Sequence, residues 1–396
     1  MIRENGDLER RIGMIIKIAA ANTSEQYKKQ ADVVCTGTHD EQIINEQIER
    51  LTTGGTIQFF DGDYYLDSFS EEGNTAVFFG YNDGQARVIN LVGCTENKAY
   101  NTHYGTCFHV TKAAIDSCCQ EDTYRVFAGT RRRPDAPGDF FTMTYVNNVN
   151  FENFYLYLYD ASKPVIGIDC SRFGASEIHQ VGVFTERFFE DRFLHEKPAT
   201  PCKGCIGIRT CNSSSDEMAR MGIDTTDIGG LYIGYDFIGA DHMILRNCFA
   251  ARCCYGFSFD VSHKTITLLN CADEGNTHLP LFKGHGQITM IDFNIERFNA
   301  AYIPDDPMGQ STPYAQETEP GSWHGFISYT LQGNAFGVTH FWENGHGRNF
   351  TTVNQYHDRN SRPKYPEYLE NYFDTETNKL ITWTGTHWVD AMGNIV

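Results

Sequence analysis

A segment of about 23 residues recurs in the middle of the chain and limits the folds that the chain can adopt. The runs MILRNC, ITLLNC and ITMIDF begin at positions 243, 266 and 288, so that Asn247 precedes Asn270 by 23 residues and Asn270 precedes Asp292 by 22. Each run is a short stretch rich in β-branched residues or leucine that ends in Asn or Asp. A unit this short cannot bury its apolar side alone, so it must stack on copies of itself.

The content of each repeat distinguishes among the stacked folds. Every period holds two or three short strand patterns and no 3.6-residue periodicity, which favours an all-β right-handed parallel β-helix over a helical solenoid. A propeller fits less well because its repeat is longer and holds four strands. Asn at the strand ends fits the β-helix, because Asn tolerates left-handed backbone geometry and its amide can bond the amide of the next repeat.

The charge balance and the cysteines narrow the class of protein further. The chain has 32 basic and 51 acidic residues, a formal charge of −19, which argues against nucleic acid as a partner because phosphate backbones bind basic surfaces. Residues 1–21 carry scattered charges, so we expect neither a signal peptide nor a membrane span. The thirteen cysteines predict reduced, buried thiols rather than disulfides; a zinc site at Cys202, Cys205 and Cys211 is the alternative. We otherwise expect no metal and no cofactor.

Residues 14–66 carry the first external resemblance. They combine an apolar strand pattern, a helix pattern from Asp40 to Leu51, and a Gly54-Gly55 turn before a second strand pattern. This segment resembles the opening of the pectate-lyase-like β-helix superfamily, in the variant common in bacteriophage tail and prophage proteins. The resemblance implies that the helix covers the first turn of the solenoid, with its acidic first residues suited to the helix dipole rather than to catalysis. It implies a fold and not a reaction, because it includes no pectate-lyase catalytic motif.

The last segment, residues 362–396, resembles the terminal hairpin of phage and prophage tail proteins. Two strand patterns meet at Thr384 and Gly385, with Trp383 and Trp388 beside the turn. The resemblance implies a homotrimer. The expected lack of a signal peptide favours a place in a virion or prophage particle or in the cytoplasm. We therefore divide the chain into an N-terminal segment with the helix (1–66), the parallel β-helix with loop insertions (67–300), an irregular region with a histidine-rich loop at 340–346 (301–361), and a C-terminal β module (362–396).

Aligning the repeats brings two acidic residues together. We align Asn247, Asn270 and Asp292 at one ladder position. Four residues later, Glu274 and Glu296 then lie roughly 5 Å apart on adjacent strands, with Asp273 beside them. Two carboxylates at this spacing fit a retaining glycosidase, and their mutual repulsion gives one acid and one base. The alternative is a surface ladder of ion pairs that contributes little energy.

Cationic and aromatic residues supply the expected substrate contacts. Arg252 and Arg297 flank the two glutamates in this alignment and would bind an acidic sugar or hold one carboxylate ionised. The strand pattern at 154–159 places Tyr155, Tyr157 and Tyr159 on one side and apolar residues on the other. The tyrosine side either contacts another subunit or offers rings on which sugars stack.

These patterns predict a carbohydrate-active enzyme that hydrolyses a polysaccharide or oligosaccharide. The expected catalytic residues are Glu274, Glu296 and Asp273. Two other enzymes on the same fold remain open: a lyase, whose base would come from Arg252, His263, Lys283 or Arg297, and an intramolecular fructotransferase. A non-catalytic glycan-binding tail fibre is the alternative outside the enzymes.

Overall fold

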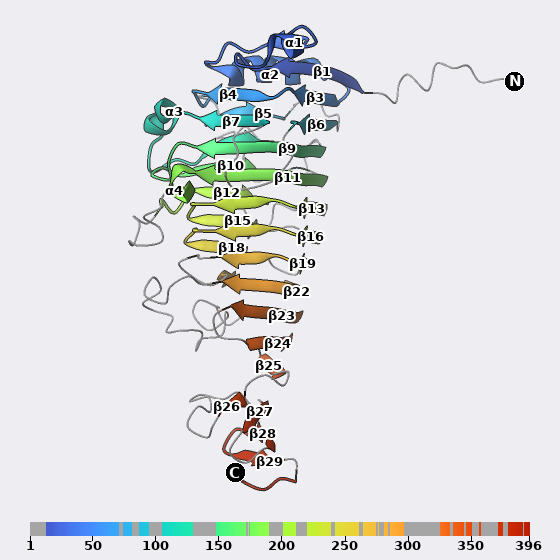
Figure 1. Cartoon of the computed structure of the whole chain (residues 1–396), viewed down its shortest axis with the longest axis vertical. Helices are drawn as coiled ribbons and strands as arrows, with labels where there is room; N and C mark the ends of the chain where they lie inside the picture. Colours follow the sequence, from blue (N-terminus) through green and yellow to red (C-terminus); the bar gives the residue numbers. More distant parts are fainter. Residues whose placement is uncertain are drawn as a thin grey trace, which may run out of the picture.

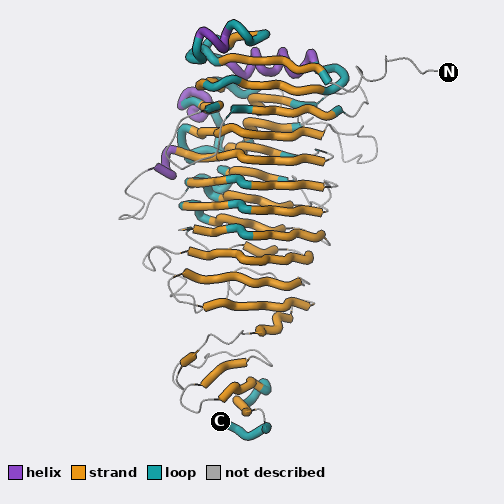
Figure 2. Tube along the Cα trace, turned by 45° about the vertical axis from the view of Figure 1, so that its right-hand side comes forward, coloured by secondary structure: helices purple, strands orange, loops and turns teal. Residues whose placement is uncertain are grey.

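The strands of the chain follow one another along a single axis and form long parallel β-sheets. The computed structural model describes residues 13–70, 74–80, 87–94, 105–129, 148–171, 173, 175–189, 201–210, 220–238, 242–260, 264–274, 276, 281–283, 286–296, 325–332, 336–343, 346–350, 356–357, 371–374, 379–390 and 392–396. Most of these residues lie in strands, which confirms an all-β chain with parallel sheets. Figure 1 shows the strands following one another along the long axis in chain order, and Figure 2 shows loops joining them at the sides of the stack.

Two columns of parallel strands make up most of the largest sheet. The first column consists of β1 (Met14–Ala19), β3 (Gly55–Phe59), β6 (Val88–Val92), β9 (Asn148–Leu158), β11 (Ala175–Thr185), β13 (Arg220–Asp224), β16 (His242–Arg246), β19 (Lys264–Leu269) and β22 (Gly286–Glu296), with the two-residue β2 (Val33–Val34) beside β1. The second column consists of β4 (Gly62–Leu66), β7 (Thr106–Val110), the later halves of β9, β11 and β22, β14 (Asp227–Gly229), β17 (Phe249–Ala251), β20 (Ala272–Glu274) and β23 (Gly325–Gln332).

A separate seven-stranded parallel sheet forms the third column. Its strands are β5 (Thr75–Phe78), β8 (Tyr124–Ala128), β10 (Val165–Asp169), β12 (Ile206–Arg209), β15 (Ile233–Ile238), β18 (Tyr255–Asp260) and β21 (Leu281–Lys283). Each repeat in the middle of the chain therefore contributes one strand to each column. Two short helices, α3 (Lys112–Ser117) and α4 (Glu186–Phe189), interrupt this order.

The corner between the first and second columns explains the asparagines of the repeat. Five residues at this ladder position have positive φ: Asn153, Gln180, Thr225, Asn247 and Asn270. Such backbone geometry turns the chain sharply and is tolerated best by Asn among the residues that carry a side chain. The expected role of the repeated Asn is therefore confirmed at the two positions that carried the repeat.

An unbroken row of apolar side chains runs inside the first column. Each member lies directly opposite the next on the neighbouring strand, and none is more than 2% exposed: Ile16, Ile57, Leu91, Phe151, Ile178, Ile223, Leu245, Leu268 and Met290. Aromatic rings stack in the same way from the third column, with Tyr235 and Phe257 5.0 Å apart. Burial of these rows supplies the main stabilising energy of the stack, because no repeat covers its own apolar side.

The helix α2 (Asp40–Arg50) covers the N-terminal end of the stack as expected. It buries Ile44 and Ile48 and lies with α1 (Glu25–Lys28) at the blue end of Figure 1. The Asp40 carboxylate accepts hydrogen bonds from the backbone N–H groups of Thr36, Gly37 and Tyr65. Asp40 therefore joins the helix to the first strands, and burial raises the pKa of its carboxyl group.

The region expected to be irregular contains regular strands, and this expectation is corrected. β23 pairs antiparallel with β24 (Phe336–Glu343), which pairs antiparallel with β25 (His346–Phe350). The histidine-rich segment at 340–346 is thus no long loop, since Glu343 and His346 are paired residues of a hairpin. The loop expected from Gly and Asn therefore does not extend over the whole of 340–346.

The terminal module forms a four-stranded sheet, shown in red in Figure 1. Its strands are β26 (Tyr356–His357), β27 (Asn371–Asp374), β28 (Lys379–Trp383) and β29 (Trp388–Asp390). β28 and β29 form the hairpin expected around Thr384 and Gly385, and the rings of Trp383 and Trp388 lie 5.6 Å apart.

The twelve described cysteines are free thiols, and nine of them are buried. Cys205 is fully buried, and Cys211, the third member of the zinc alternative, lies outside the described residues. No helix in the described part of the chain is long and apolar enough to cross a membrane.

Candidate functional site

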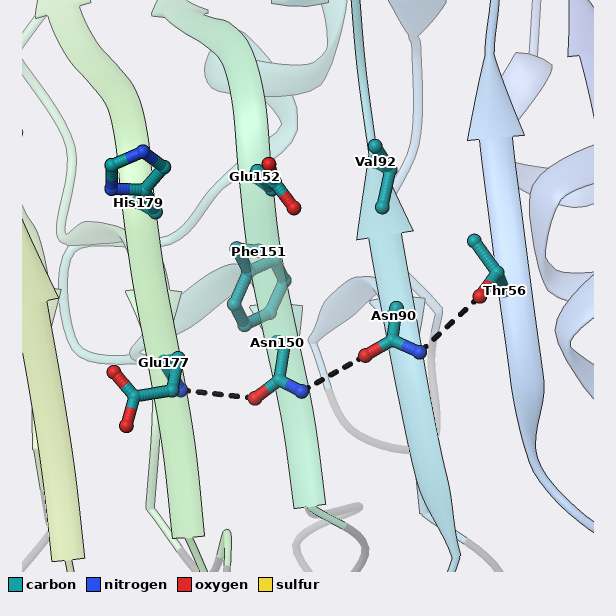
Figure 3. Close-up of a pocket in the computed structure, with 8 residues that line it drawn as sticks. All are labelled: Thr56, Asn90, Val92, Asn150, Phe151, Glu152, Glu177 and His179. Atoms are coloured by element: carbon teal, nitrogen blue, oxygen red, sulfur yellow. Dashed lines mark hydrogen bonds between the residues drawn. The ribbon is translucent and has the colours of Figure 1, made fainter. Parts of the chain in front are cut away.

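The first column carries a pocket of about 340 Å³ on its outer side, shown in Figure 3. Its polar lining comes from four successive strands of the column, β3, β6, β9 and β11. Glu152, Glu177 and His179 line one part of it, and the other part is lined by Thr56, Asn90 and Asn150. The pocket therefore combines two carboxylates and an imidazole with amide and hydroxyl groups.

The parallel register places the ionisable groups of the pocket. Glu152 on β9 lies directly opposite His179 on β11, which lies opposite Asp224 on β13. His179 Nδ1 is 4.0 Å from Asp224 Oδ2. Glu177 precedes His179 by two residues and therefore points to the same side of the strand. Four ionisable side chains from three neighbouring strands thus share one surface.

A row of hydrogen-bonded amides forms the floor beside these groups. Asn150 Nδ2 donates to Asn90 Oδ1 at 2.9 Å, and Asn90 Nδ2 donates to Thr56 Oγ1 at 3.2 Å. The backbone N–H of Glu177 donates to Asn150 Oδ1 at 3.0 Å, so this row continues to the acidic side of the pocket. These bonds leave Asn150 one further N–H and one further lone pair for a polar ligand.

The predicted pair of glutamates occupies the expected positions along the backbone. Glu274 on β20 lies directly opposite Glu296 on β22, and Ala251 on β17 lies opposite Glu274. The ladder deduced from the repeat is therefore confirmed. Glu274 is half-buried, whereas the side chain of Glu296 and the whole of Arg297 lie outside the described residues.

Asp273 lies on the other side of β20 from Glu274, so its expected position beside the two glutamates is corrected. It is 2% exposed, and its Oδ1 accepts a 2.7 Å hydrogen bond from Asn276 Nδ2. Asn276 also donates to the backbone oxygen of Ala250 and accepts from the N–H of Cys253. Successive residues of a strand face opposite sides, so Asp273 faces away from Glu274. Its bond to Asn276 stabilises an inner corner of the stack, and Asp273 does not belong to the expected acidic pair.

Arg252 contacts the chain itself, which corrects its expected place beside a substrate. Its guanidinium donates a hydrogen bond to the backbone oxygen of Phe188 and lies 5.3 Å from the centre of the Phe188 ring. Its backbone has φ of 55° at the corner after the second column. Arg252 therefore fastens α4 to the stack.

The alternation of the tyrosine strand is confirmed, but its tyrosine side is largely covered. Tyr155 is 5% exposed, and burial raises its pKa to about 12. Tyr157 packs against His109 and against Phe189 of α4. Tyr159 is 37% exposed and remains available to a ligand. Residues of α4 and of neighbouring strands cover the rings of Tyr155 and Tyr157. The expectation that sugars stack on Tyr155 is therefore corrected, because this ring belongs to an aromatic cluster within the chain.

The sequence analysis did not find Glu152, Glu177, His179 or Asp224 as a group. Glu152 and Asp224 each immediately precede a corner residue with positive φ, Asn153 and Thr225, and His179 precedes Gln180. Only the Asn corners belong to a visible sequence repeat. An alignment of all corners would have brought the three residues into one row.

Comparisons with known proteins give little beyond the structure. No protein-family model matches the sequence, and the curated proteins contain no match either. Among solved structures, the chain is similar to ORF18 of Geobacillus virus E2, with a TM-score of 0.34 and 12% identity over 89% of this chain and 82% of that one.

Proposed function

We propose that the chain is a carbohydrate-active enzyme that hydrolyses a polysaccharide or oligosaccharide in the pocket beside Glu152 and Glu177. The observation that carries the proposal is that two carboxylates and an imidazole line one pocket of about 340 Å³. That volume lies within the range of small-ligand pockets, roughly 300–1,000 Å³. A pocket on the outer side of an elongated stack also suits a linear polymer better than a compact ligand.

The positions of the two glutamates suit an inverting hydrolysis. They are diagonal neighbours on adjacent parallel strands, which places their Cα atoms about 8 Å apart. The Glu177 carboxylate lies against Gly222 on β13, and that of Glu152 accepts a hydrogen bond from Asn153, so the proposal requires both to turn towards a bound substrate. Inverting glycosidases hold their carboxyl groups roughly 6.5–9.5 Å apart to admit a water molecule. In this reaction one carboxylic acid protonates the leaving oxygen, while the other carboxylate removes a proton from the attacking water. His179, between Glu152 and Asp224, supplies a further proton-transfer group, and Asn150 binds sugar hydroxyls.

The pair Glu274 and Glu296 is the second candidate dyad. Its direct pairing across one rung supports the retaining geometry expected from the sequence, because adjacent parallel strands are about 4.8 Å apart. The two dyads predict different stereochemistry at the anomeric carbon. The anomeric configuration of the product therefore shows which of the two dyads is catalytic.

The proposal extends to architecture and assembly. We infer that the three columns form a right-handed parallel β-helix of the phage-tail type, which assembles as a homotrimer in a virion or prophage particle, or acts in the cytoplasm. Two neighbouring apolar side chains support assembly, because Leu269 and Ile291 lie opposite each other and are 37% and 39% exposed. Light scattering coupled to size-exclusion chromatography tests the trimer.

The decisive experiment incubates the purified chain with bacterial capsules, plant glycans and fructans. New reducing ends without ultraviolet absorbance are expected, and Glu152→Gln or Glu177→Gln should lower turnover by roughly 10²- to 10⁴-fold. Glu25→Gln is the control, because that side chain is 79% exposed on α1. Loss of turnover only in Glu274→Gln and Glu296→Gln would transfer the reaction to the second dyad.

Other products would contradict hydrolysis. Ultraviolet absorbance from unsaturated uronates would indicate a lyase, and a product lighter by one water without absorbance would indicate intramolecular transfer. Glycan binding without turnover across the whole panel would identify a non-catalytic fibre.

A further inference from the structure

Three potential metal ligands meet on the outer side of the second column. They are Asp63 on β4 and Cys107 and His109 on β7, and their ligand atoms all lie within 4.8 Å of one another. Cys107 lies directly opposite Asp63, and His109 follows two residues later on the same side of the strand. His109 Nε2 is 2.8 Å from Asp63 Oδ1. The cluster is thus a direct product of the register between two repeats.

Neighbouring side chains hold the cluster in place. The imidazole of His109 stacks between Tyr65 at 5.2 Å and Tyr157 at 5.4 Å, which restricts rotation of the ring. Asn22 Nδ2 donates to Asp63 Oδ2 at 2.7 Å, while Asp63 Oδ1 faces His109. Partners of this kind orient metal ligands in known sites and strengthen metal binding.

The burial of the three residues leaves one side of the cluster open. Cys107 is 1% exposed and forms the inner wall, whereas the side chains of Asp63 and His109 are 32% and 26% exposed. A metal ion can therefore reach the cluster from solvent. It would also retain a water molecule, because three protein ligands leave a tetrahedral ion one position short.

We propose that Asp63, Cys107 and His109 bind a zinc ion that joins β4 to β7, with the fourth position held by water. The combination of thiolate, imidazole and carboxylate matches the ligands that Zn²⁺ takes in proteins. On binding, the Cys107 thiol gives its proton to solvent and the sulfur forms the new bond to zinc. Before binding, the His109 ring carries its proton on Nε2, where it bonds Asp63; exchange with solvent moves this proton to Nδ1, and the Nε2 lone pair then bonds the metal. No electron is transferred.

The site is distinct from the pocket on the first column. Asp63 and Cys107 lie 44 residues apart in sequence, so no short ligand motif reveals them. The expectation of no metal rested on such motifs, and the register between repeats is what brings these residues together. The proposed zinc site stands or falls independently of glycan hydrolysis.

The test uses the full chain after chelation and dialysis. Titration of the unmodified chain with Zn²⁺ should show one site. Cys107→Ser and His109→Phe should each weaken the affinity for Zn²⁺ by at least about tenfold. His109→Phe keeps an aromatic ring between Tyr65 and Tyr157, so it separates loss of the ligand from loss of stacking. Cys119→Ser is the matched control, because Cys119 is an exposed thiol elsewhere on the chain.

Cobalt gives a spectroscopic check on the ligands. Co²⁺ at the site should produce a thiolate-to-cobalt charge-transfer band, which Cys107→Ser abolishes and Cys119→Ser retains. Zinc should also raise the melting temperature of the unmodified chain and leave that of His109→Phe unchanged. Absence of high-affinity zinc in the unmodified chain, or equal binding by all variants, would overturn the proposal. Circular dichroism confirms that each variant is folded before titration.

Discussion

The side-chain amide of Asn270 donates a hydrogen bond to the side-chain oxygen of Asn247 on the neighbouring strand, at 2.9 Å. Asn247 in turn donates to Asp224 Oδ1 at 3.2 Å. Both asparagines have φ of 52°. One residue type thus meets two requirements of a repeating corner, since it accepts the left-handed backbone and links one repeat to the next.

Replacing this corner residue separates the two contributions. Asn270→Ala should lower the free energy of unfolding by about 2 kcal/mol, because it loses the hydrogen bond and places alanine in a left-handed conformation. Asn270→Gly should cost about 1 kcal/mol, since glycine keeps the backbone geometry and loses only the side-chain bond. Urea unfolding measures both. Equal costs would show that backbone strain plays no part.

Adjacent leucines test the inner apolar row. Leu268 is fully buried, whereas Leu269 next to it is 37% exposed. Leu268→Ala should lower the free energy of unfolding by about 2–5 kcal/mol, because it opens a cavity in a continuous row. Leu269→Ala should change the free energy of unfolding of the unassembled single chain by less than about 0.5 kcal/mol. Thermal or urea unfolding compares the two, and a reversed order would mean that the strand faces the other way.

A buried ion pair in the third column gives a third prediction. Arg125 Nε donates to Asp169 Oδ2 at 2.5 Å, and both side chains are almost fully buried. Arg125→Met should lower the free energy of unfolding by roughly 3–5 kcal/mol, because it leaves a buried carboxylate without its cation. Adding Asp169→Asn should recover part of that loss in a double-mutant cycle of urea unfolding. Strictly additive effects would contradict coupling between the two side chains.

The terminal hairpin should depend on pH. The Asp390 carboxylate accepts hydrogen bonds from Lys379 Nζ at 2.8 Å and from the backbone N–H of Asn394 at 2.9 Å, and these hold its pKa well below the usual range. A carboxyl group whose pKa is depressed by folding stabilises the hairpin above its unfolded pKa of about 4 and loses this effect as the pH falls towards its folded value.

The signal for this transition comes from the adjacent, mutually tilted indoles of Trp383 and Trp388. Their near-ultraviolet circular dichroism should weaken in acid for the unmodified chain, while Asp390→Asn should show a smaller change with pH. Asp116→Asn is the control, because its ion pair with Lys112 lies exposed on α3. An identical acid response in all three proteins would contradict the role of Asp390.

Part of the candidate site followed from the sequence and part did not. The repeat predicted that Glu274 pairs with Glu296, because both follow a recognisable Asn or Asp by four residues. It did not predict the row of Glu152, His179 and Asp224, because their corner residues are Asn153, Gln180 and Thr225 and share no residue type. Left-handed geometry is a property of the backbone, and different side chains satisfy it.

The sequence by itself determined the parallel stacking, the capping helix α2, the Asn corners and the terminal hairpin. Each of these depends on local patterns: a short period, a helix repeat, or a turn residue. Outside the visible repeat, tertiary structure alone decided which polar groups meet on the outer surface. Asp63 and Cys107, like Glu152 and His179, become neighbours only through the register of strands. That register is set by the alignment of buried side chains, since a shift of one residue would turn every inner side chain outward.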